Sequence, residues 1–507
     1  MTHNKALPIM VQGTHSDAGK SVIATALCRI FAQDGFRTAP FKSQNMSLNS
    51  YITHDGKEIG RAQGVQAEAA EIVATTDMNP ILIKPTRDDE AQIVVHGKPL
   101  KNMKAFSYRN DYYETAKDII EKSYQNLASS FERIVIEGAG SPAEVNLNDR
   151  ELVNMRVANM ADAPVLLVGD IDKGGVFASL VGTLQLLSPQ DRDRVVGVII
   201  NKFRGDLALL EPGLSWFEEY TGKPVLGVIP YINDLLIDAE DSLSIGNYSL
   251  HKNKDKELDI AVISFPRISN FTDIDPIIFE QDSHVRFVEK ANQLEQPDVI
   301  ILPGSKNTID DLMYIREKGL EQEIIRAHQN GAVVFGICGG YQMLGKTIED
   351  PYQVESKIKC AEGLKLIPIH TTLTKEKTTV RSEGTLYLAG EKANVTGYEI
   401  HMGNTTHLSS FHSFIQLNNR EDGSKNVSET CMGTYLHGVF HNDHFRWLFL
   451  NHIRKKKGLQ PIGNRESYDD RQFNEYNRLA KHVRGAINIK RLNQIIEQFP
   501  KRKRDHL

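Results

Sequence analysis

Short, nearly continuous apolar runs recur along this chain, and each is followed by glycine or a turn residue and then by a helical pattern. The first set is LPIMVQG (7–13), RIVIEGAG (133–140), APVLLVGD (163–170), VVGVIINKF (195–203) and PVLGVIP (224–230). A second set follows residue 257: DIAVISFP (259–266), DVIILPG (298–304) and AVVFGIC (332–338). Such runs are typical of parallel strands buried on both faces. They predict an α/β fold with two doubly wound, mostly parallel sheets and with sites at the carboxyl ends of strands.

The length of the chain, 507 residues, exceeds what one hydrophobic core usually organises. Between the two sets of runs, the segment INDLLIDAEDSLSIGNYSLHKNKDKELD (232–259) turns polar and charged towards its end, as linkers do. We therefore expect one domain over residues 1–250, a second over 251–455 and a helical tail over 456–507. Apolar residues at helical spacing predict that this tail is a pair of helices packed on the body of the protein: Phe473, Tyr476, Ala480, Val483, Leu492, Ile495 and Ile496.

Charge and cysteine usage narrow the functional classes. The formal charge of −5 comes from 60 basic and 65 acidic residues, so we expect no general attraction to nucleic acid or to a membrane. The chain contains no apolar run long enough to span a bilayer, and its first residues lack the apolar core of a signal peptide. The cysteines are widely spaced and form neither a disulfide framework nor a zinc pattern: Cys28, Cys338, Cys360 and Cys431. We expect a cytoplasmic protein with small-molecule partners.

The segment QGTHSDAGKS (12–21) follows the first apolar run and ends in Gly19-Lys20-Ser21. Backbone amides at a helix N-terminus favour anions, Lys20 adds a positive charge, and Ser21 offers a ligand to Mg²⁺, so the segment predicts an ATP-phosphate loop. The alternative is a plain glycine turn between strand and helix. The loop is longer than the usual pattern, because five residues separate Gly13 from Gly19 and Thr14 takes the slot of the first glycine.

This longer loop resembles that of dethiobiotin synthetase and its amidoligase relatives, which activate a carboxylate with ATP. Partition ATPases carry a lysine five residues before the last lysine of the loop, where this chain has His15. In RIVIEGAG, Glu137 ends a strand beside glycines and is similar to the glutamate that binds Mg²⁺ in the amidoligase group. Asp55 is a second metal candidate, although Asp-Gly is equally typical of a surface turn. Lys42 follows another expected strand and is a candidate to neutralise the transferred phosphate, with a solvated lysine as the alternative.

The segment AVVFGICGGYQMLG (332–345) is the most specific pattern in the chain. A buried strand runs directly into Cys338 and then into two glycines and a helical pattern, which predicts a nucleophile elbow rather than a structural cysteine. The N–H of Gly339 would face an oxyanion. A second donor is expected from the loop at Gly304, which ends the run DVIILPG.

A general base is expected at His437, in GTYLHGVFHND about a hundred residues after the cysteine. Together these residues resemble the class I glutamine amidotransferases, which release ammonia from glutamine through a thioester. Most of that class carry a glutamate two residues after the histidine, where this chain has Val439. Three alternatives stay open at this point: Glu399 orients the imidazole, a Cys–His dyad suffices, or Glu399 and His401 only line the glutamine or acceptor pocket. No third catalytic residue is assigned.

Several longer segments resemble the cobyric acid synthases of cobalamin biosynthesis, over nearly the whole chain: FKSQNMSLNSYIT, DGKEIGRAQGVQAEAA, MNPILIKP, EGAGSPAEVNLN, DIDKGGVFASLVGT, INKFRGD and PGSKNT. The resemblance implies amidation of the b, d, e and g carboxylates of adenosylcobyrinic acid a,c-diamide, with one glutamine and one ATP, as its Mg²⁺ complex, per amide. The alternatives are a related amide synthetase acting on cobyrinic acid or on a cell-wall lipid intermediate, and a non-catalytic, partition-type ATP-binding module. The sister enzyme, cobyrinic acid a,c-diamide synthase, has G-P-D-Y-I-D-P where this chain reads SQNMSLNS.

Overall fold

The computed structural model describes residues 6–86, 89–233, 235, 237, 253, 255–408 and 412–502. Contacts divide the chain into two compact units. The first comprises Met1–Ser47, Glu58–Ile237 and Gln472–Leu507, and the second comprises Leu48–Lys57 and Asp238–Arg471. Residues 238–252, which hold much of the expected linker and the expected boundary near residue 250, lie outside the described residues. The domain limits expected from the sequence stay a prediction.

The first unit is built on a six-stranded sheet in the order β12-β11-β10-β1-β9-β2, and every neighbouring pair is parallel. Its strands are β1 (Leu7–Gly13), β2 (Thr38–Phe41), β9 (Arg133–Glu137), β10 (Val165–Asp170), β11 (Val195–Phe203) and β12 (Val225–Pro230). Its helices include α1 (Lys20–Gln33), α2 (Arg61–Ala69), α4 (Tyr113–Ser130), α5 (Met155–Ala161), α6 (Val176–Leu186), α7 (Pro189–Arg194) and α8 (Leu207–Thr221). The chain passes from one side of β1 to the other between β9 and β10, so ligands are expected at the carboxyl end of β1.

A smaller sheet in the order β3-β6-β7-β8 also belongs to the first unit. Its strands are β3 (Gln44–Met46), β6 (Ile81–Pro85), β7 (Glu90–Val95) and β8 (Lys98–Lys104), and β5 (Glu58–Gly60), η1 (Thr76–Met78), α3 (Ala105–Asp111) and η2 (Asn148–Arg150) complete the unit. Apart from the β3–β6 pair, this sheet is antiparallel, and the sequence analysis did not predict it.

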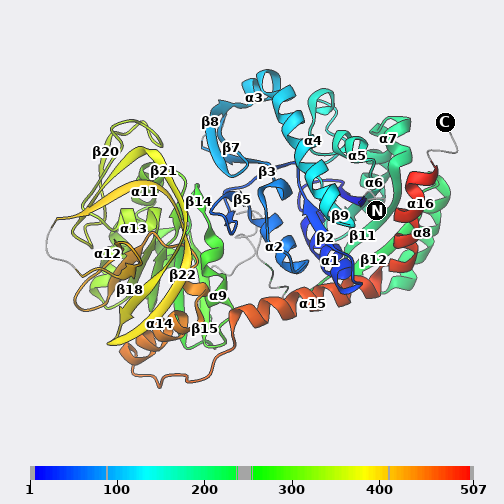
Figure 1. Ribbon diagram of the computed structural model, residues 1–507. Coiled ribbons are helices and arrows are strands. Elements are labelled where there is room, and N and C mark those ends of the chain that lie inside the picture. The colour runs from blue at the N-terminus through cyan, green and yellow to red at the C-terminus, as the bar shows by residue number, and fades with distance from the viewer. Residues whose placement is uncertain are drawn as a thin grey trace. The chain divides into compact units, whose positions relative to one another are not determined.

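The end of the chain packs on the first unit. Helices α15 (Tyr468–Ala486) and α16 (Ile489–Arg502) place Leu479, Val483, Leu492 and Ile496 in the same buried cluster as the apolar face of α1. The turn between the two helices bridges to β12, where Ile487 pairs with Gly227 (Figure 1). The apolar residues of the two helices are thus buried against the first unit at these four positions, whereas Phe473 stays 43% exposed beneath the guanidinium of Arg29.

The second unit has its own six-stranded sheet in the order β15-β13-β16-β18-β26-β25, parallel except for β25. The strands are β13 (Leu258–Ile263), β15 (Ser283–Val288), β16 (Val299–Leu302), β18 (Val333–Ile337), β25 (Ser424–Lys425) and β26 (Cys431–Thr434). Its helices are η4 (Phe271–Ile274), α9 (Asp275–Ile278), α10 (Ala291–Leu294), α11 (Thr308–Glu317), α12 (Leu320–Gln329), α13 (Gly339–Met343), η5 (Val439–His441) and α14 (Asp443–Lys456). The prediction of two mostly parallel α/β sheets is confirmed.

A second layer of strands, which the sequence analysis did not predict, covers part of this sheet. Its centre is the long antiparallel pair β21 (Ile369–Leu388) and β22 (Glu391–His407), seen in yellow in Figure 1. The same sheet contains β19 (Thr347–Glu349), β20 (Cys360–Glu362), β23 (Ile415–Leu417) and β24 (Glu421–Asp422). Outside this sheet, β14 (Ile268–Ser269) pairs with β17 (Gly304–Ser305), and the unit also includes β4 (Ser50–Ile52). Leu386, Ala393 and Val395 of the long pair are buried in the same core as the parallel sheet.

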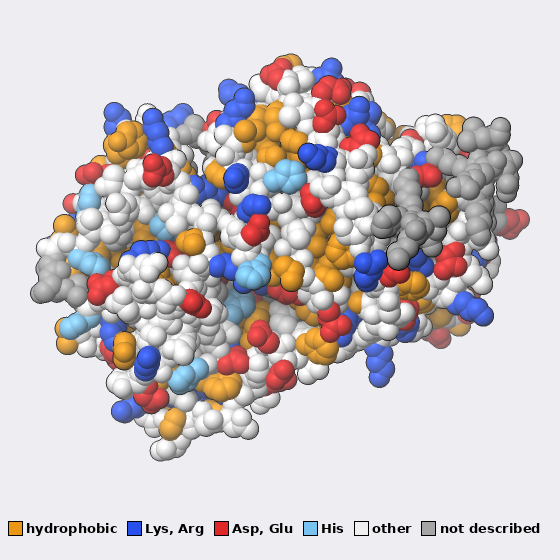
Figure 2. All heavy atoms as spheres, in the orientation of Figure 1, with side chains coloured by type: hydrophobic (Ala, Val, Ile, Leu, Met, Phe, Trp, Pro, Cys, Tyr) orange, Lys and Arg blue, Asp and Glu red, His pale blue; other side chains and the backbone are white. Residues whose placement is uncertain are grey.

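Charged side chains of both signs are scattered over one face of the molecule. On the face that Figure 2 presents, Lys and Arg side chains are interspersed with Asp and Glu side chains. Within the described ranges, none of the helices combines the length and the apolar composition that crossing a membrane requires.

Candidate functional site

The predicted phosphate loop connects β1 to α1 in the first unit. Gly19 has φ +99° and precedes the first helical residue, Lys20. A Cβ on Gly19 would lie 2.1 Å from Nδ2 of Asn201, and a Cβ on Gly13 would lie 3.1 Å from Cβ of Ala18. Both the backbone angle and the close packing therefore require glycine at position 19.

Neighbouring strands hold the outer part of this loop. The Thr14 amide donates to the carbonyl of Val168 in β10 at 2.9 Å. The Lys202 ammonium, at the end of β11, donates to the carbonyl of Asp17 and to the carboxylate of Asp170, both at 2.7 Å. Lys20 donates to the carbonyl of His15 at 3.0 Å, so its side chain curls over the loop. The sequence analysis assigned no role to Lys202.

Three side chains converge on Glu137, which is 1% exposed at the end of β9. Its Oε1 accepts from Ser21 Oγ and from Lys42 Nζ, each at 2.8 Å. Its Oε2 accepts from Gln66 Nε2 at 2.5 Å. The structure thus brings together the predicted residues Ser21, Lys42 and Glu137 at the foot of the loop. Gln66 was not predicted. The polar residues on the buried face of α2 are the sequence signal that could have indicated it.

The oxygen atoms of this cluster fit Mg²⁺. Gln66 Oε1 is buried and accepts no hydrogen bond from any described residue. Hydroxyl, carboxylate and amide oxygens are the hard ligands that Mg²⁺ prefers. Among the residues that the structure describes, no three His, Cys, Asp or Glu side chains are grouped as a metal site. A metal here would therefore take further ligands from phosphate oxygens and water.

Asp55, the second metal candidate, belongs to the second unit. Its carboxylate pairs with Lys57 Nζ at 2.7 Å and accepts from Thr53 Oγ1 at 2.5 Å. These hydrogen bonds, first that of Lys57 and then that of Thr53, lower the pKa of Asp55. The Thr53 amide also donates to the carbonyl of Lys57, which closes a turn at 2.8 Å. The contacts agree with the alternative of a surface turn, and the metal role of Asp55 stays a prediction.

In the second unit, Cys338 lies between the end of β18 and the start of α13. Its φ of 51° and ψ of −109° are strained for a residue with a side chain, as in a nucleophile elbow. The Cys338 amide donates to the carbonyl of Thr434 at 2.8 Å, and Sγ lies 3.7 Å from the carbonyl oxygen of Ile400. A Cβ on Gly340 would lie 1.9 Å from the carbonyl oxygen of Leu302, so only glycine lets α13 pack on β16.

The two predicted oxyanion-hole residues lie beside this elbow. A Cβ on Gly339 would lie 2.8 Å from the amide nitrogen of Ser305, and one on Gly304 would lie 3.1 Å from Cε1 of His437. The Ser305 hydroxyl donates to Asp311 Oδ2 at 2.6 Å, which holds the loop. Burial raises the pKa of Asp311 to about 7. Gly304, Gly339, Cys338 and His437 are therefore brought to one edge of the sheet.

His437 follows β26 and is fully buried. Its backbone exchanges hydrogen bonds with Tyr398 at 2.8 and 3.1 Å, and its ring stacks on that of Tyr398 with centroids 5.1 Å apart. Nδ1 lies 2.6 Å from Asp273 Oδ2, whereas Nε2 is buried without a hydrogen-bond partner among the described residues. Burial lowers the pKa of His437, but the charges of Asp273 and Cys338 outweigh burial and raise the pKa to about 10.

Glu399, the carboxylate considered for orienting the imidazole of His437, contacts other residues. Its carboxylate accepts from Ser382 Oγ at 2.6 Å, lies 3.4 Å from His401 Nε2 and pairs with Arg420. The carboxylate that meets the imidazole is instead that of Asp273. Asp273 was not predicted from the sequence because it precedes His437 by 164 positions. A usable signal was its place shortly after β13, one of the strands whose carboxyl ends form this edge of the sheet.

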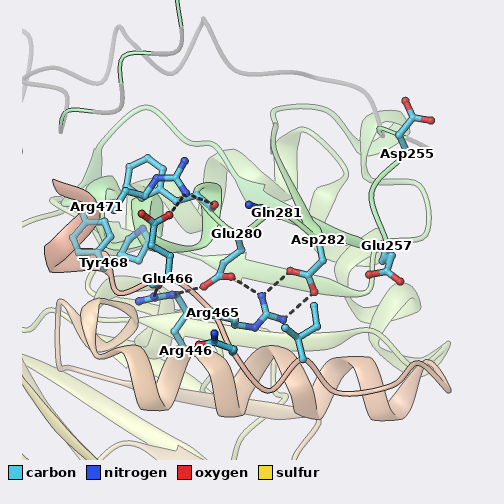
Figure 3. A pocket seen from close by; sticks show the side chains of 14 residues that line it. Asp255, Glu257, Glu280, Gln281, Asp282, Arg446, Arg465, Glu466, Tyr468 and Arg471 are labelled. Atoms are coloured by element: carbon cyan, nitrogen blue, oxygen red, sulfur yellow. Dashed lines mark hydrogen bonds and ion pairs between the residues drawn. The ribbon is translucent and has the colours of Figure 1, made fainter. Parts of the chain in front are cut away.

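The second unit also has a pocket of about 440 Å³ away from Cys338. Figure 3 shows Glu280 and Asp282 facing the guanidinium of Arg465, and Arg446 Nε donates to Glu280 at 2.7 Å. These charges neutralise one another and tie the segment before β15 to α14 and to the segment that follows it. We assign the pocket a structural role.

Comparisons with known proteins assign a family to each of the two halves of the chain. Residues 9–245 match the family model described as the CobQ/CobB/MinD/ParA nucleotide binding domain, and residues 259–445 match the CobB/CobQ-like glutamine amidotransferase domain. The chain is similar to the cobyric acid synthase of Geobacillus sp. (strain WCH70), with 61% identity over 98% of this chain and 99% of that protein. It is 59% identical to the cobyric acid synthase of Anoxybacillus flavithermus over 98% of each chain, and 49% identical to that of Desulforamulus reducens over 97% and 98%.

Proposed function

Because this chain belongs to the cobyric acid synthases, we propose that it amidates the b, d, e and g side-chain carboxylates of adenosylcobyrinic acid a,c-diamide to give cobyric acid. One glutamine and one ATP are consumed for each amide. The observation that carries the proposal is the presence of two different reaction sites in one chain: a nucleophile elbow beside a buried histidine, and a phosphate loop beside a buried Lys–Glu pair. Family membership supports the choice of substrate.

The glutaminase step uses the site at Cys338. The thiolate attacks the side-chain amide carbon of glutamine, and the developing oxyanion is stabilised by the amide of Gly339 and by the loop at Gly304. His437, protonated at neutral pH because its pKa is raised to about 10, gives its proton to the leaving nitrogen. Ammonia departs, and water then hydrolyses the thioester to glutamate.

The ligase step uses the site at Lys20. The loop amides and Lys20 bind the phosphates of ATP, and Lys42 faces the charge that develops on the transferred phosphoryl group. Mg²⁺, held by Ser21 and Glu137, would neutralise phosphate charge. The substrate carboxylate takes the terminal phosphoryl group, and ammonia displaces phosphate from the activated carboxyl. Glu137 links the ammonium group of Lys42 to the proposed metal ligand Ser21.

We infer a cytoplasmic location and small-molecule partners alone. The described structure has free cysteines at positions 28, 338, 360 and 431, which suits a reducing compartment. The mixed surface charges favour neither nucleic acid nor a membrane as a partner.

The proposal is tested by incubating the full chain with ATP, Mg²⁺, glutamine and the a,c-diamide, followed by mass spectrometry of the corrinoid. Each amide replaces a hydroxyl by an amino group, so four successive decreases of about one mass unit are expected. A corrinoid of unchanged mass would reject the proposal. Amidation of cobyrinic acid in place of the diamide would instead favour the sister enzyme.

A further inference from the structure

Asp273 makes both of its carboxylate contacts at the base of the candidate glutaminase site. Oδ2 lies 2.6 Å from His437 Nδ1, and Oδ1 accepts from the Gly438 amide at 2.8 Å. The side chains of Asp273 and His437 are 2% and 0% exposed, so water does not compete for these contacts. One carboxylate therefore fixes both the imidazole and the backbone that follows it.

We propose that Asp273 is the positioning residue of the Cys338–His437 pair, supplied from the segment after β13 instead of from the position two residues after the histidine. The inference rests on the proposed glutaminase function. At the usual position the chain has Val439, which is apolar and fully buried. Glu399, the other acidic residue considered, is held by Ser382, His401 and Arg420.

The geometry determines the proton arrangement. An ionised carboxylate only accepts hydrogen bonds, so the ring nitrogen facing Asp273 carries a proton, and Nε2 is the nitrogen directed away from it. Asp273 thereby sets the tautomer and the orientation of the ring, as the aspartate does in a Ser–His–Asp triad. Tyr398 stacks on the ring and prevents it from tilting, with an interplanar angle of 15°.

In the reaction, Nε2 holds the proton taken from Cys338, and the Sγ thiolate forms a bond to the amide carbon of glutamine while the carbonyl π bond opens to the oxyanion. When the tetrahedral intermediate collapses, the carbon–nitrogen bond breaks and the proton on Nε2 goes to the leaving nitrogen. Asp273 keeps its charge throughout and stabilises the imidazolium. Asp273 faces His437 from the η4 turn and Cys338 faces it from the elbow, and the Tyr398 ring covers one side.

The test is the variant Asp273→Asn in the full chain, with glutamine hydrolysis measured as a function of pH. We expect kcat to fall roughly 100-fold or more with little change in KM, because the imidazole loses its fixed tautomer but the glutamine contacts remain. The imidazolium also loses the charge that retains its proton, so the alkaline limb of the profile is expected at lower pH. Wild-type kcat and an unmoved alkaline limb would overturn the inference.

Asp259→Asn is the matched control. Asp259 is also a buried carboxylate in this unit, and it accepts from Arg286 Nε at 2.8 Å. Its loss is expected to lower the melting temperature without moving the alkaline limb. An equal movement of the limb in this control would show a general effect of instability and would overturn the positioning role.

Two further measurements separate this inference from the proposed function. Asp273→Asn is expected to retain amidation with added ammonia, whereas an inactive wild type would refute the proposed function itself. If Asp273→Asn does not fold, Asp273→Glu is measured instead. This variant keeps the charge but displaces the ring, so a lower kcat with an alkaline limb near that of the wild type supports the inference. Wild-type kcat in Asp273→Glu would overturn it.

Discussion

Glu137 is the residue on which the first site depends. It is the buried acceptor for Ser21, Lys42 and Gln66, and its pair with Lys42 is 2.8 Å long with both side chains nearly inaccessible. Removing one partner of a buried ion pair destabilises the protein far more than the intact pair stabilises it, because the remaining buried charge has no compensation.

We expect Glu137→Gln to lower the free energy of unfolding of the first unit by about 3 kcal/mol and ATP-dependent amidation by roughly 100-fold. Chemical denaturation measures the first effect, and ADP release in the presence of the corrinoid measures the second. Glutamine hydrolysis at Cys338 should survive in the folded variant. Wild-type ADP release would show that Glu137 has no part in the ligase site.

Glu399 gives the second unit an acid-sensitive contact. Burial raises the pKa of Glu399, but hydrogen bonds from His401, Arg420 and Ser382 outweigh it and lower the pKa from 4.5 to about 2. A carboxyl whose pKa is lower in the folded state stabilises the fold above its unfolded pKa. That contribution is lost as the pH falls from 4.5 towards 2.

The wild type should therefore lose about 2 to 3 kcal/mol more stability than Glu399→Gln over this pH range. Urea denaturation of both proteins at several pH values measures the difference. Equal pH dependence in the two proteins would contradict the assignment.

At the scale of secondary structure, the junction of β18 and α13 positions Cys338, the proposed nucleophile. The short helix α13 lies so close to β16 that the Cα of Gly340 faces the carbonyl of Leu302, and the Cα of Gly339 faces the amide of Ser305. The glycines that follow Cys338 therefore determine how near the oxyanion loop can approach the sulfur.

Gly340→Ala places a Cβ 1.9 Å from Leu302 O, and the backbone has to move. We expect a loss of about 3 kcal/mol in unfolding free energy and a large loss of glutaminase activity. Thermal unfolding and glutamine hydrolysis test this. Gly463→Ala is the control in the same unit, because a Cβ there meets nothing within 4 Å. If the two variants were equally stable, the packing argument would be wrong.

At the scale of the whole molecule, each unit has its own sheet, its own buried core and its own candidate site. The predicted ATP and Mg²⁺ residues, Asp55 excepted, lie in the first unit, and the predicted residues of the glutaminase site lie in the second. This division predicts that the two half-reactions can be separated by mutation.

Cys338→Ala should abolish amidation with glutamine and leave amidation with added ammonia close to the wild-type rate, because the ligase residues are unchanged. Product analysis by mass spectrometry with each nitrogen source is the measurement. Loss of both activities in a folded variant would contradict the proposed division of labour.

Much of this could be predicted from local patterns. The runs at 7–13 and 195–203 coincide with β1 and β11, and the other runs lie within a few residues of their strands, because a strand buried on both faces requires consecutive apolar residues. The glycines around Lys20 and Cys338 indicated both loops for a similar reason, because a strained backbone and the close approach of neighbouring groups require glycine. The sequence by itself therefore determined the two α/β sheets and the positions of the candidate phosphate loop and the candidate nucleophile elbow.

The tertiary structure alone decided which distant side chains complete the sites. Asp273 meets His437 because β13 and β26 belong to one parallel sheet, and the segments that follow these strands begin at the same edge of the sheet. Gln66 meets Glu137, and Lys202 meets Asp17, through comparable long-range packing. No spacing in the sequence encodes such pairs, because strand order, rather than distance along the chain, determines which groups become neighbours.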